Sequence, residues 1–388
     1  LYTLFLPPVA LFCIVWNINR TAEIWQKLRL PLIVLAFLFC WMWLGAVMSE
    51  YPKIALKHSG RYSIFLMTFL AFLFVLERDS LKKSGQIFTG IYVLLMAITF
   101  LDSHGKISIP GLLNDMGLHI DLFNPPVRQI SSFFENRAPY GVASVGMFFW
   151  SLANLRNSWI LSSLGIMAAL YSIVIAGSRN GVLTLVICLL FLLILTLKHL
   201  RKTRTAFILV LAAVIVVGSG YYTLHSQTVV RTNASLNRLL NVKAYKDLES
   251  MDVRFKIIRS ALELGIAEPP ILGSGTKTFG HEVFSKSSSL GQFNNGWHKT
   301  AFNSHNAPLT IWIEMGWVGL IAVLLFLWLW FRPALRGPPL LMMPMLAVCV
   351  GQILDYFVWE IFFMAFQSFF FAHFATTITF QEMDQSSS

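Results

Sequence analysis

Charged residues are scarce in this chain of 388 residues. They make up 13% of the sequence, whereas hydrophobic residues make up 56% and the mean hydropathy is +0.65. Soluble domains carry roughly 25% charged residues, so this composition excludes a soluble globular protein. It predicts an all-α integral membrane protein that lies among membrane lipids and has no nucleic-acid partner.

Cysteine is also scarce, and the signatures of several enzyme classes are absent. The four cysteines are Cys13, Cys40, Cys188 and Cys349. All four lie inside apolar runs, so we expect them to pack in the core rather than to form disulfides. The sequence contains no zinc-type Cys/His spacing, no P-loop and no Gly-x-Ser-x-Gly turn.

A divalent-metal site is not expected. A hard cation needs carboxylates that hold it through oxygen, and the dense acidic group outside the apolar runs consists of Asp247, Glu249 and Asp252. These residues stand among three basic ones, which favours an ion-paired surface. We therefore predict an activity that uses neither a metal nor a cofactor.

Eleven charge-poor stretches approach the length of about 20 residues that a spanning helix needs. They cover residues 1–19, 30–49, 62–76, 84–101, 138–155, 157–178, 180–197, 205–224, 306–331, 337–354 and 361–381. Because the chain starts inside an apolar run, we expect a bundle of eleven or twelve transmembrane helices. No cleavable signal peptide is expected, since no small-residue cleavage site follows a short apolar core.

Lysine and arginine predict the orientation, because they favour short cytoplasmic loops. Five short loops hold thirteen of them, with the clearest cluster at 198–204, whereas the short loops of the other side hold seven. We predict that the first set faces the cytoplasm. The other loops then face outward.

The predicted organisation has three parts. They are N-terminal transmembrane helices (1–224), a large outward loop (225–305), and C-terminal transmembrane helices with a short tail (306–388). The loop carries ten of the thirty basic residues. This excess suits either anionic head groups at the membrane surface or a substrate that carries several phosphates.

Part of the large loop is expected to be helical. Apolar residues recur every three to four positions in VRFKIIRSALELG (253–265), which predicts a helix that ends at Gly265 and could lie across the membrane face. The next segment, EPPILGSGTKTFG (268–280), combines prolines that extend the chain with glycines that turn it.

Arg179 is the first candidate for binding an anion. It falls in a very short outward turn between two apolar runs, in AGSRNGVL (176–183). Intramembrane charges usually mark a functional pathway, although a guanidinium at a helix end can also extend to the membrane surface. Gly177 and Gly181 should leave space beside it, which favours a ligand.

Arg254 is the second candidate and lies in the predicted loop helix. Arg259 follows five residues later, about 140° around the helix axis. The two arginines therefore cannot share one face, and only one is expected to point into a site. On its own, the pattern around Arg254 favours an ordinary surface arginine.

His305 and Asn306 stand at the mouth of a long apolar helix. Glu314 lies nine residues beyond His305, on the opposite face and about 13 Å deeper. It cannot orient the histidine, so we expect it to pair with another helix or to close a packing contact. Gly316 and Gly319 offer a small-residue surface for close helix approach.

Four motifs together resemble the O-antigen ligase and polymerase superfamily. HNAPLTIWIEMGWVG (305–319) is similar to its signature of His-Asn, nine residues, Gly, two residues and Gly. SRNG (178–181) resembles its Ser-Arg-Gly-Gly turn, with Asn180 in place of one glycine. Arg254 followed by EPPILGSG resembles its arginine before a Pro-Leu-Leu-Gly-x-Gly stretch. FFENRAPYG (133–141) is similar to its Asn-rich turn, although Ala-Pro departs from the usual pattern.

The resemblance implies a GT-C-like, inverting glycosyltransferase of the bacterial inner membrane. Its donor would be a glycan on undecaprenyl pyrophosphate, and the reaction would take place on the periplasmic side without a metal. For an O-antigen ligase, the acceptor is a sugar of the lipid A–core of lipopolysaccharide. The resemblance makes His305 the catalytic residue and Arg137, Arg179, Arg254 and Asn306 substrate-binding residues.

These residue types suit that chemistry. A lipid pyrophosphate is already a good leaving group, and arginines stabilise its charge through bidentate hydrogen bonds. The acceptor hydroxyl must lose a proton as it attacks, and a histidine can accept that proton. Nearby cations would keep His305 neutral and able to act as a base.

Two alternatives remain open. The same chemistry with another acceptor would make the protein an O-antigen polymerase or a protein O-oligosaccharyltransferase. A transporter or flippase for a lipid-linked anion would also line its path with arginines. Transporters commonly contain two similar halves, and no internal repeat is found in this sequence.

Overall fold

The computed structural model describes eight parts of the chain. They are residues 18–76, 78–103, 137–199, 245–268, 270–286, 306–332, 339–354 and 367–377. Within these parts the regular structure is helical, with no strand, and four helices are long and apolar enough to cross a membrane. The protein is an all-α integral membrane protein, as its composition predicted.

The described helices overlap nine of the predicted apolar stretches. They are α2 (Ile18–Met48), α3 (Pro52–Val75), α4 (Arg78–Ser103), α6 (Arg137–Ala153), α7 (Trp159–Ala176), α8 (Arg179–His199), α14 (Ala307–Phe331), α15 (Pro339–Leu354) and an unlabelled helix at 367–377. Among them, α2 and α3 begin about ten residues before their predicted stretches. The predicted stretch 205–224 and nearly all of 1–19 lie outside the described residues. Cys40, Cys188 and Cys349 are free thiols; Cys188 is buried as expected and Cys349 is partly buried, whereas Cys40 is exposed and does not pack in the core.

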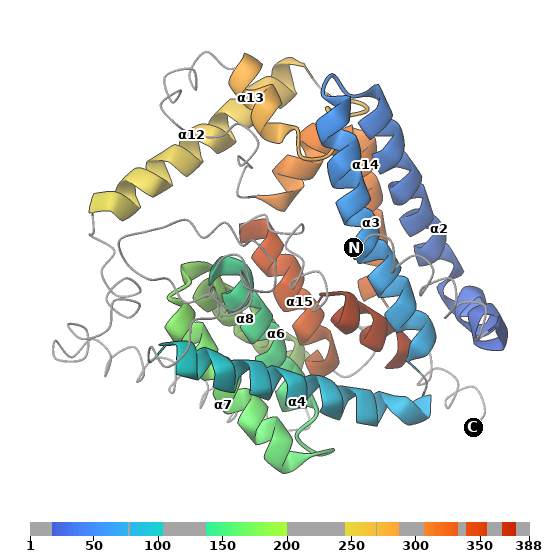
Figure 1. Ribbon diagram of the computed structural model, residues 1–388, viewed down its shortest axis with the longest axis vertical. Helices are drawn as coiled ribbons and strands as arrows, with labels where there is room; N and C mark the ends of the chain where they lie inside the picture. The colour runs from blue at the N-terminus through green and yellow to red at the C-terminus, as the bar shows by residue number, and fades with distance from the viewer. Residues whose placement is uncertain are drawn as a thin grey trace.

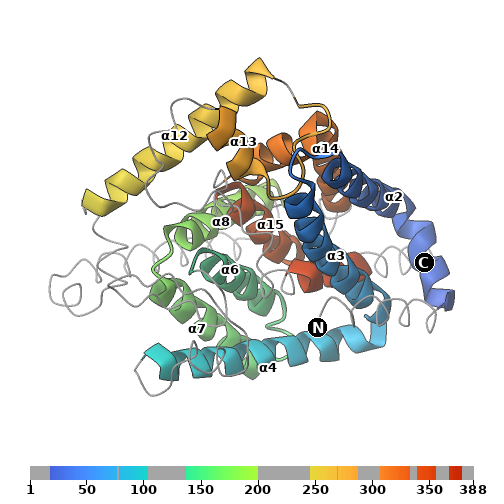
Figure 2. The same ribbon diagram turned by 45° about the horizontal axis from the view of Figure 1, so that its top comes forward.

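The helices pack in two groups (Figures 1 and 2). In one group α2 packs against α3 and α14, and in the other α6 packs against α7, α8 and α15, while α4 packs against α7. The helix at 367–377 joins the groups, because Phe369 stacks on Phe88 of α4 and also meets Phe72 of α3 edge-on. Buried aromatic and aliphatic side chains of both groups thus form one main core, and two smaller apolar clusters lie beside it.

α14 is broken in its outer third. Gly316 has φ 70° and ψ −175°, so its backbone leaves the helical conformation. A positive φ of this kind favours glycine, which has no Cβ to clash with the backbone. The sequence predicted Gly316 as part of a small-residue packing surface, whereas its principal effect is to divide the helix.

The break leaves main-chain groups that need partners from outside α14, and the segment 270–279 supplies most of them. The bonds are Ser274 N to Ile313 O (3.0 Å), Gly275 N to Glu314 O (2.9 Å) and Trp317 N to Pro270 O (3.0 Å). Trp41 of α2 donates its Nε1–H to the next carbonyl, that of Met315, at 2.9 Å. We call the segment 270–279 bound to the broken turn 313–317 the clasp.

Two glycines make the clasp sterically possible. A Cβ on Gly316 would overlap the carbonyl of Ile271, and a Cβ on Gly273 would overlap the carbonyl of Glu314. Gly273 also has a positive φ of 79°. Gly273 of the Pro-Gly segment and Gly316 of the His-Asn motif are therefore both needed for the same close backbone contact.

The C-terminal end of α2 and the N-terminal end of α3 hold the clasp from the other side. Thr276 Oγ1 donates to the carbonyl of Ala55 at 2.8 Å and lies 2.8 Å from Ser59 Oγ. Ser49, just after α2, donates its hydroxyl to the carbonyl of Ser274. The clasp is thus bound to three membrane helices.

The loop helix differs from its prediction in length and in the role of Gly265. α12 (Tyr245–Ala267) continues past Gly265, which does not end the helix. A Cβ at Gly265 would come 2.5 Å from the ring of Trp312, so this glycine lets α12 approach α14 closely. A short further helix, α13 (Phe279–Lys286), was not foreseen. From these contacts α12 extends away toward the side of the bundle where α8 lies (Figures 1 and 2).

We expect Gly316→Ala to destabilise the protein, because alanine would be strained at this φ and its Cβ would meet the carbonyl of Ile271. Backbone strain of this kind costs about 1–3 kcal/mol. The unfolding temperature in detergent should fall clearly. Gly90→Ala in α4 is the matched control, since nothing lies within 4 Å of its added Cβ. Equal unfolding temperatures for the two variants would show that the break is not required.

Candidate functional site

The Ser-Arg-Asn-Gly motif forms the tight turn between α7 and α8. Gly177 ends α7 in the left-handed conformation, with φ 57°, and its N–H donates to the carbonyl of Val174. Ser178 Oγ accepts from Gly181 N at 3.2 Å, as expected for a residue that caps a helix N-terminus. Arg179 is thereby placed as the first residue of α8, with a partly buried side chain.

The first turns of α6 and α8 cross at two glycines. A Cβ on Gly181 would come 3.1 Å from the backbone of Gly141, so the two helices touch through their main chains. Because α6 begins at Arg137, the crossing brings the chain positions of Arg137 and Arg179 to the same end of the bundle. We expected Gly177 and Gly181 to leave space beside Arg179, but the structure gives each a backbone role.

The last turn of α15 connects these helices with the His-Asn motif. Asn180 Nδ2 donates to the carbonyl of Gly351 at 3.3 Å, and Asn306 Nδ2 donates to the carbonyl of Ile353 at 3.0 Å. These two carbonyls stand at the end of one helix. They therefore fix the start of α8 and the start of α14 with respect to each other.

Asn306 is the N-cap of α14. Its Oδ1 accepts from Leu309 N at 2.9 Å while its Nδ2 holds Ile353, so both ends of the amide have partners. This cap sets the direction in which the chain enters the helix. His305 directly precedes Asn306 in the sequence and lies outside the described residues, so its catalytic role remains a prediction.

Motifs far apart in the sequence thus meet at one end of the bundle. Asn180, Asn306 and Val142 of α6 contact the last turn of α15, so the starts of α6, α8 and α14 lie at the same end of the bundle. Gly351 and Ile353 were not foreseen as parts of this site, because they contribute main-chain carbonyls. The sequence offered one signal for this position, which is Gly351 itself in CVGQIL (349–354), inside an otherwise apolar helix.

The two loop arginines are placed differently. Arg254 lies in the middle of α12, and its side chain is outside the described part, as are those of Asp247, Glu249 and Asp252. Arg259 is 81% exposed and pairs with Glu263 at 2.8 Å on the outer surface of α12. The prediction that Arg259 points away from a site is consistent with this placement.

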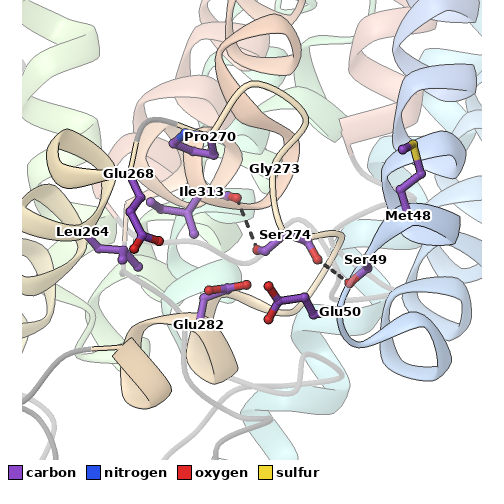
Figure 3. A pocket seen from close by; sticks show the side chains of 10 residues that line it. All are labelled: Met48, Ser49, Glu50, Leu264, Glu268, Pro270, Gly273, Ser274, Glu282 and Ile313. Carbon is purple, nitrogen blue, oxygen red and sulfur yellow. Dashed lines mark hydrogen bonds between the residues drawn. The ribbon is translucent and has the colours of Figure 1, made fainter.

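A pocket of about 250 Å³ lies beside the clasp, and sequence reasoning did not predict it. Its lining consists of Met48, Ser49, Glu50, Leu264, Glu268, Pro270, Gly273, Ser274, Glu282 and Ile313. Figure 3 shows that three carboxylates from three different segments reach its wall around Ser274. Neither Arg179 nor Asn306 lines this pocket, and its acidity would repel a phosphate.

Charged groups are also buried inside the clasp. Glu314 is 3% exposed and accepts at 3.3 Å from the N–H of Phe279, the first residue of α13, so its carboxylate pairs with the start of another helix. Lys277, which has a positive φ of 63°, is buried beside Glu314.

Burial, together with the charges of Arg61, Lys277 and Lys57, lowers the pKa of His58 to about 4. His58, which precedes the predicted span in α3, is therefore neutral at neutral pH.

Comparison with known families matches residues 164–324 to the family described as O-antigen ligase. No curated protein sequence matches the chain. The matched region covers less than half of the chain, runs from α7 into α14, and contains three of the four motifs.

Two of the three matched motifs are the partners that meet in the clasp. The motif at 133–141 lies outside the match. The match supports an activity of the glycan ligase or polymerase type. It confirms the resemblance that the motifs suggested: residues 164–324 match the family described as O-antigen ligase.

Proposed function

We propose that the protein is an O-antigen ligase, a metal-independent, inverting glycosyltransferase. It transfers O-antigen polysaccharide from undecaprenyl pyrophosphate to the lipid A–core oligosaccharide. The reaction takes place at the periplasmic side of the bacterial inner membrane, the side to which we assign the loop 225–305. The predicted division into 1–224, 225–305 and 306–388 is part of this proposal.

One observation carries the proposal. Asn180, next to Arg179, and Asn306, next to His305, both donate to the last turn of α15, to the carbonyls of Gly351 and Ile353. The arginine would bind the phosphates of the donor, and the histidine would accept a proton from the acceptor. Because the two substrates react with each other, the two residues must lie near one another. The shared carbonyl anchor supports such an arrangement.

In the proposed reaction, the acceptor hydroxyl attacks the anomeric carbon of the donor glycan. The bond between that carbon and the pyrophosphate oxygen breaks, and undecaprenyl pyrophosphate leaves. His305 takes the proton of the hydroxyl, while Arg179 and Arg254 stabilise the negative charge of the leaving pyrophosphate. Attack from the side opposite the leaving group inverts the anomeric centre.

Purified protein given a lipid-linked glycan and lipid A–core should form the glycosylated core. Omission of the core distinguishes a ligase from a polymerase, because a polymerase would then lengthen the glycan on its lipid carrier. Movement of the intact lipid-linked glycan across a vesicle membrane, without a new glycosidic bond, would contradict both enzymatic functions and favour a transporter.

We expect His305→Ala to lower transfer by roughly 10²-fold or more, the usual contribution of a general base. Expression and membrane insertion should be unchanged. Transfer is measured at matched amounts of inserted protein. Near-normal turnover by the inserted variant would exclude the catalytic role of His305.

Transfer should persist in excess EDTA, because the proposed site uses arginines where other transferases use a metal to neutralise the leaving group. The rate is measured before and after chelation. A loss that Mg²⁺ or Mn²⁺ restores would contradict the metal-independent mechanism, and Asp247, Glu249 and Asp252 would then be the first ligands to test.

Arg179→Lys and Arg254→Lys should each lower transfer about ten- to a hundredfold. Each variant loses a charge-assisted hydrogen bond of about 1.5–3 kcal/mol, since a lysine cannot replace a two-pronged guanidinium. Arg259→Ala is the control, because Arg259 is exposed and paired with Glu263. If both lysine variants match the parent, or if Arg259→Ala is the slowest, the assignment to the pyrophosphate is wrong.

A further inference from the structure

We infer that Glu314 and Lys277 are positioning residues that set the place of the outer end of α14, and with it the His-Asn motif. This inference deepens the proposed function and rests on it. Neither residue is assigned to touch a substrate. Both act through the backbone of the clasp.

The outer part of α14 is mechanically separate from the rest of the helix. The non-helical Gly316 interrupts the hydrogen bonds that would otherwise carry the helical register from the membrane to Asn306. Residues 307–315 form only about two and a half turns. Their position therefore depends on what binds the broken turn, and that partner is the segment 270–279.

Glu314 is the side chain that ties this broken turn to the loop. Its main-chain carbonyl accepts from Gly275, and its carboxylate accepts from the N–H of Phe279, so one residue binds both ends of the tight turn 275–279. Lys277 lies between these two residues in the same turn, and its charge acts on the carboxylate of Glu314. With side chains 3% and 6% exposed, the two charges lie out of solvent.

The conformation of Lys277 strengthens this interpretation. Non-glycine residues seldom adopt a positive φ, and 63° at Lys277 is the one such value among the described residues. Strained backbone persists where the surroundings determine it. The contacts with Glu314 on one side, and those of Thr276 with α3 on the other, provide these surroundings.

A shift of the broken turn would reach the site directly. Asn306 stands at the tip of the outer part of α14, and its bond to the carbonyl of Ile353 requires α14 and α15 to stay in register. A misplacement of about 1 Å can lower a rate by about 10²-fold. Arg179 is held through Asn180 by the carbonyl of Gly351 and makes no bond to the clasp, so its position should depend less on the clasp than that of the His-Asn motif.

The experiment compares Glu314→Gln, Lys277→Met and the double variant. Each single change removes one of two opposite charges that are buried in the clasp, which is costly, whereas the double change removes both. We expect each single variant to lose about ten- to a hundredfold in kcat, a larger change than that in the KM for the lipid-linked donor. The double variant should recover most of the lost kcat. Glu263→Gln, on the exposed face of α12, should match the parent.

Amide hydrogen exchange provides a readout that does not need the enzymatic reaction. The amides of Gly275, Phe279 and Trp317 should exchange faster in each single variant and return toward the parent rate in the double variant. If one single variant fails to insert into the membrane, the double variant and the other single variant still test whether Glu314 and Lys277 act together.

Three results would overturn the inference. They are unchanged kcat in both single variants, a double variant no better than either single one, and unchanged exchange at the three amides. Exchange that responds as expected in a protein that transfers no glycan would instead refute the proposed function while supporting the link between Glu314 and Lys277.

Discussion

A helix that breaks inside an apolar environment leaves carbonyl and N–H groups that must find partners within the protein. In this chain the break at Gly316 exposes three successive carbonyls, and they accept from Ser274, Gly275 and Trp41. The partners come from a loop and from α2. This one constraint joins the large loop to the membrane helices and explains why glycines stand at both Gly273 and Gly316.

The same logic operates at the end of α15. A helix leaves its last carbonyls without intrahelical partners, and here the amide side chains of Asn180 and Asn306 donate to two carbonyls of the last turn. Unsatisfied main-chain groups thus act as anchors in both places. The candidate binding and catalytic residues are therefore positioned by main-chain groups, which leave no motif in the sequence.

Sequence patterns predicted the membrane helices well, since an apolar run of sufficient length has few alternatives in a bilayer. They failed where a residue has more than one structural use. Gly265 was expected to end a helix, but it makes room for Trp312 instead, and α13 was missed because its eight residues are too short for a clear periodicity. For Glu314 the sequence indicated a partner, and the fold identified that partner as a turn of the loop.

By itself, the sequence determined that the chain is a helical membrane protein and which residues are candidates for binding and catalysis. Composition and local spacing are sufficient for this, because each helix satisfies its own backbone and each motif is short. Only the tertiary structure decided which motifs meet. The pairing of Gly273 with Gly316, and the convergence of Asn180 and Asn306 on α15, depend on contacts between segments separated by tens to more than a hundred residues. No local pattern records such contacts.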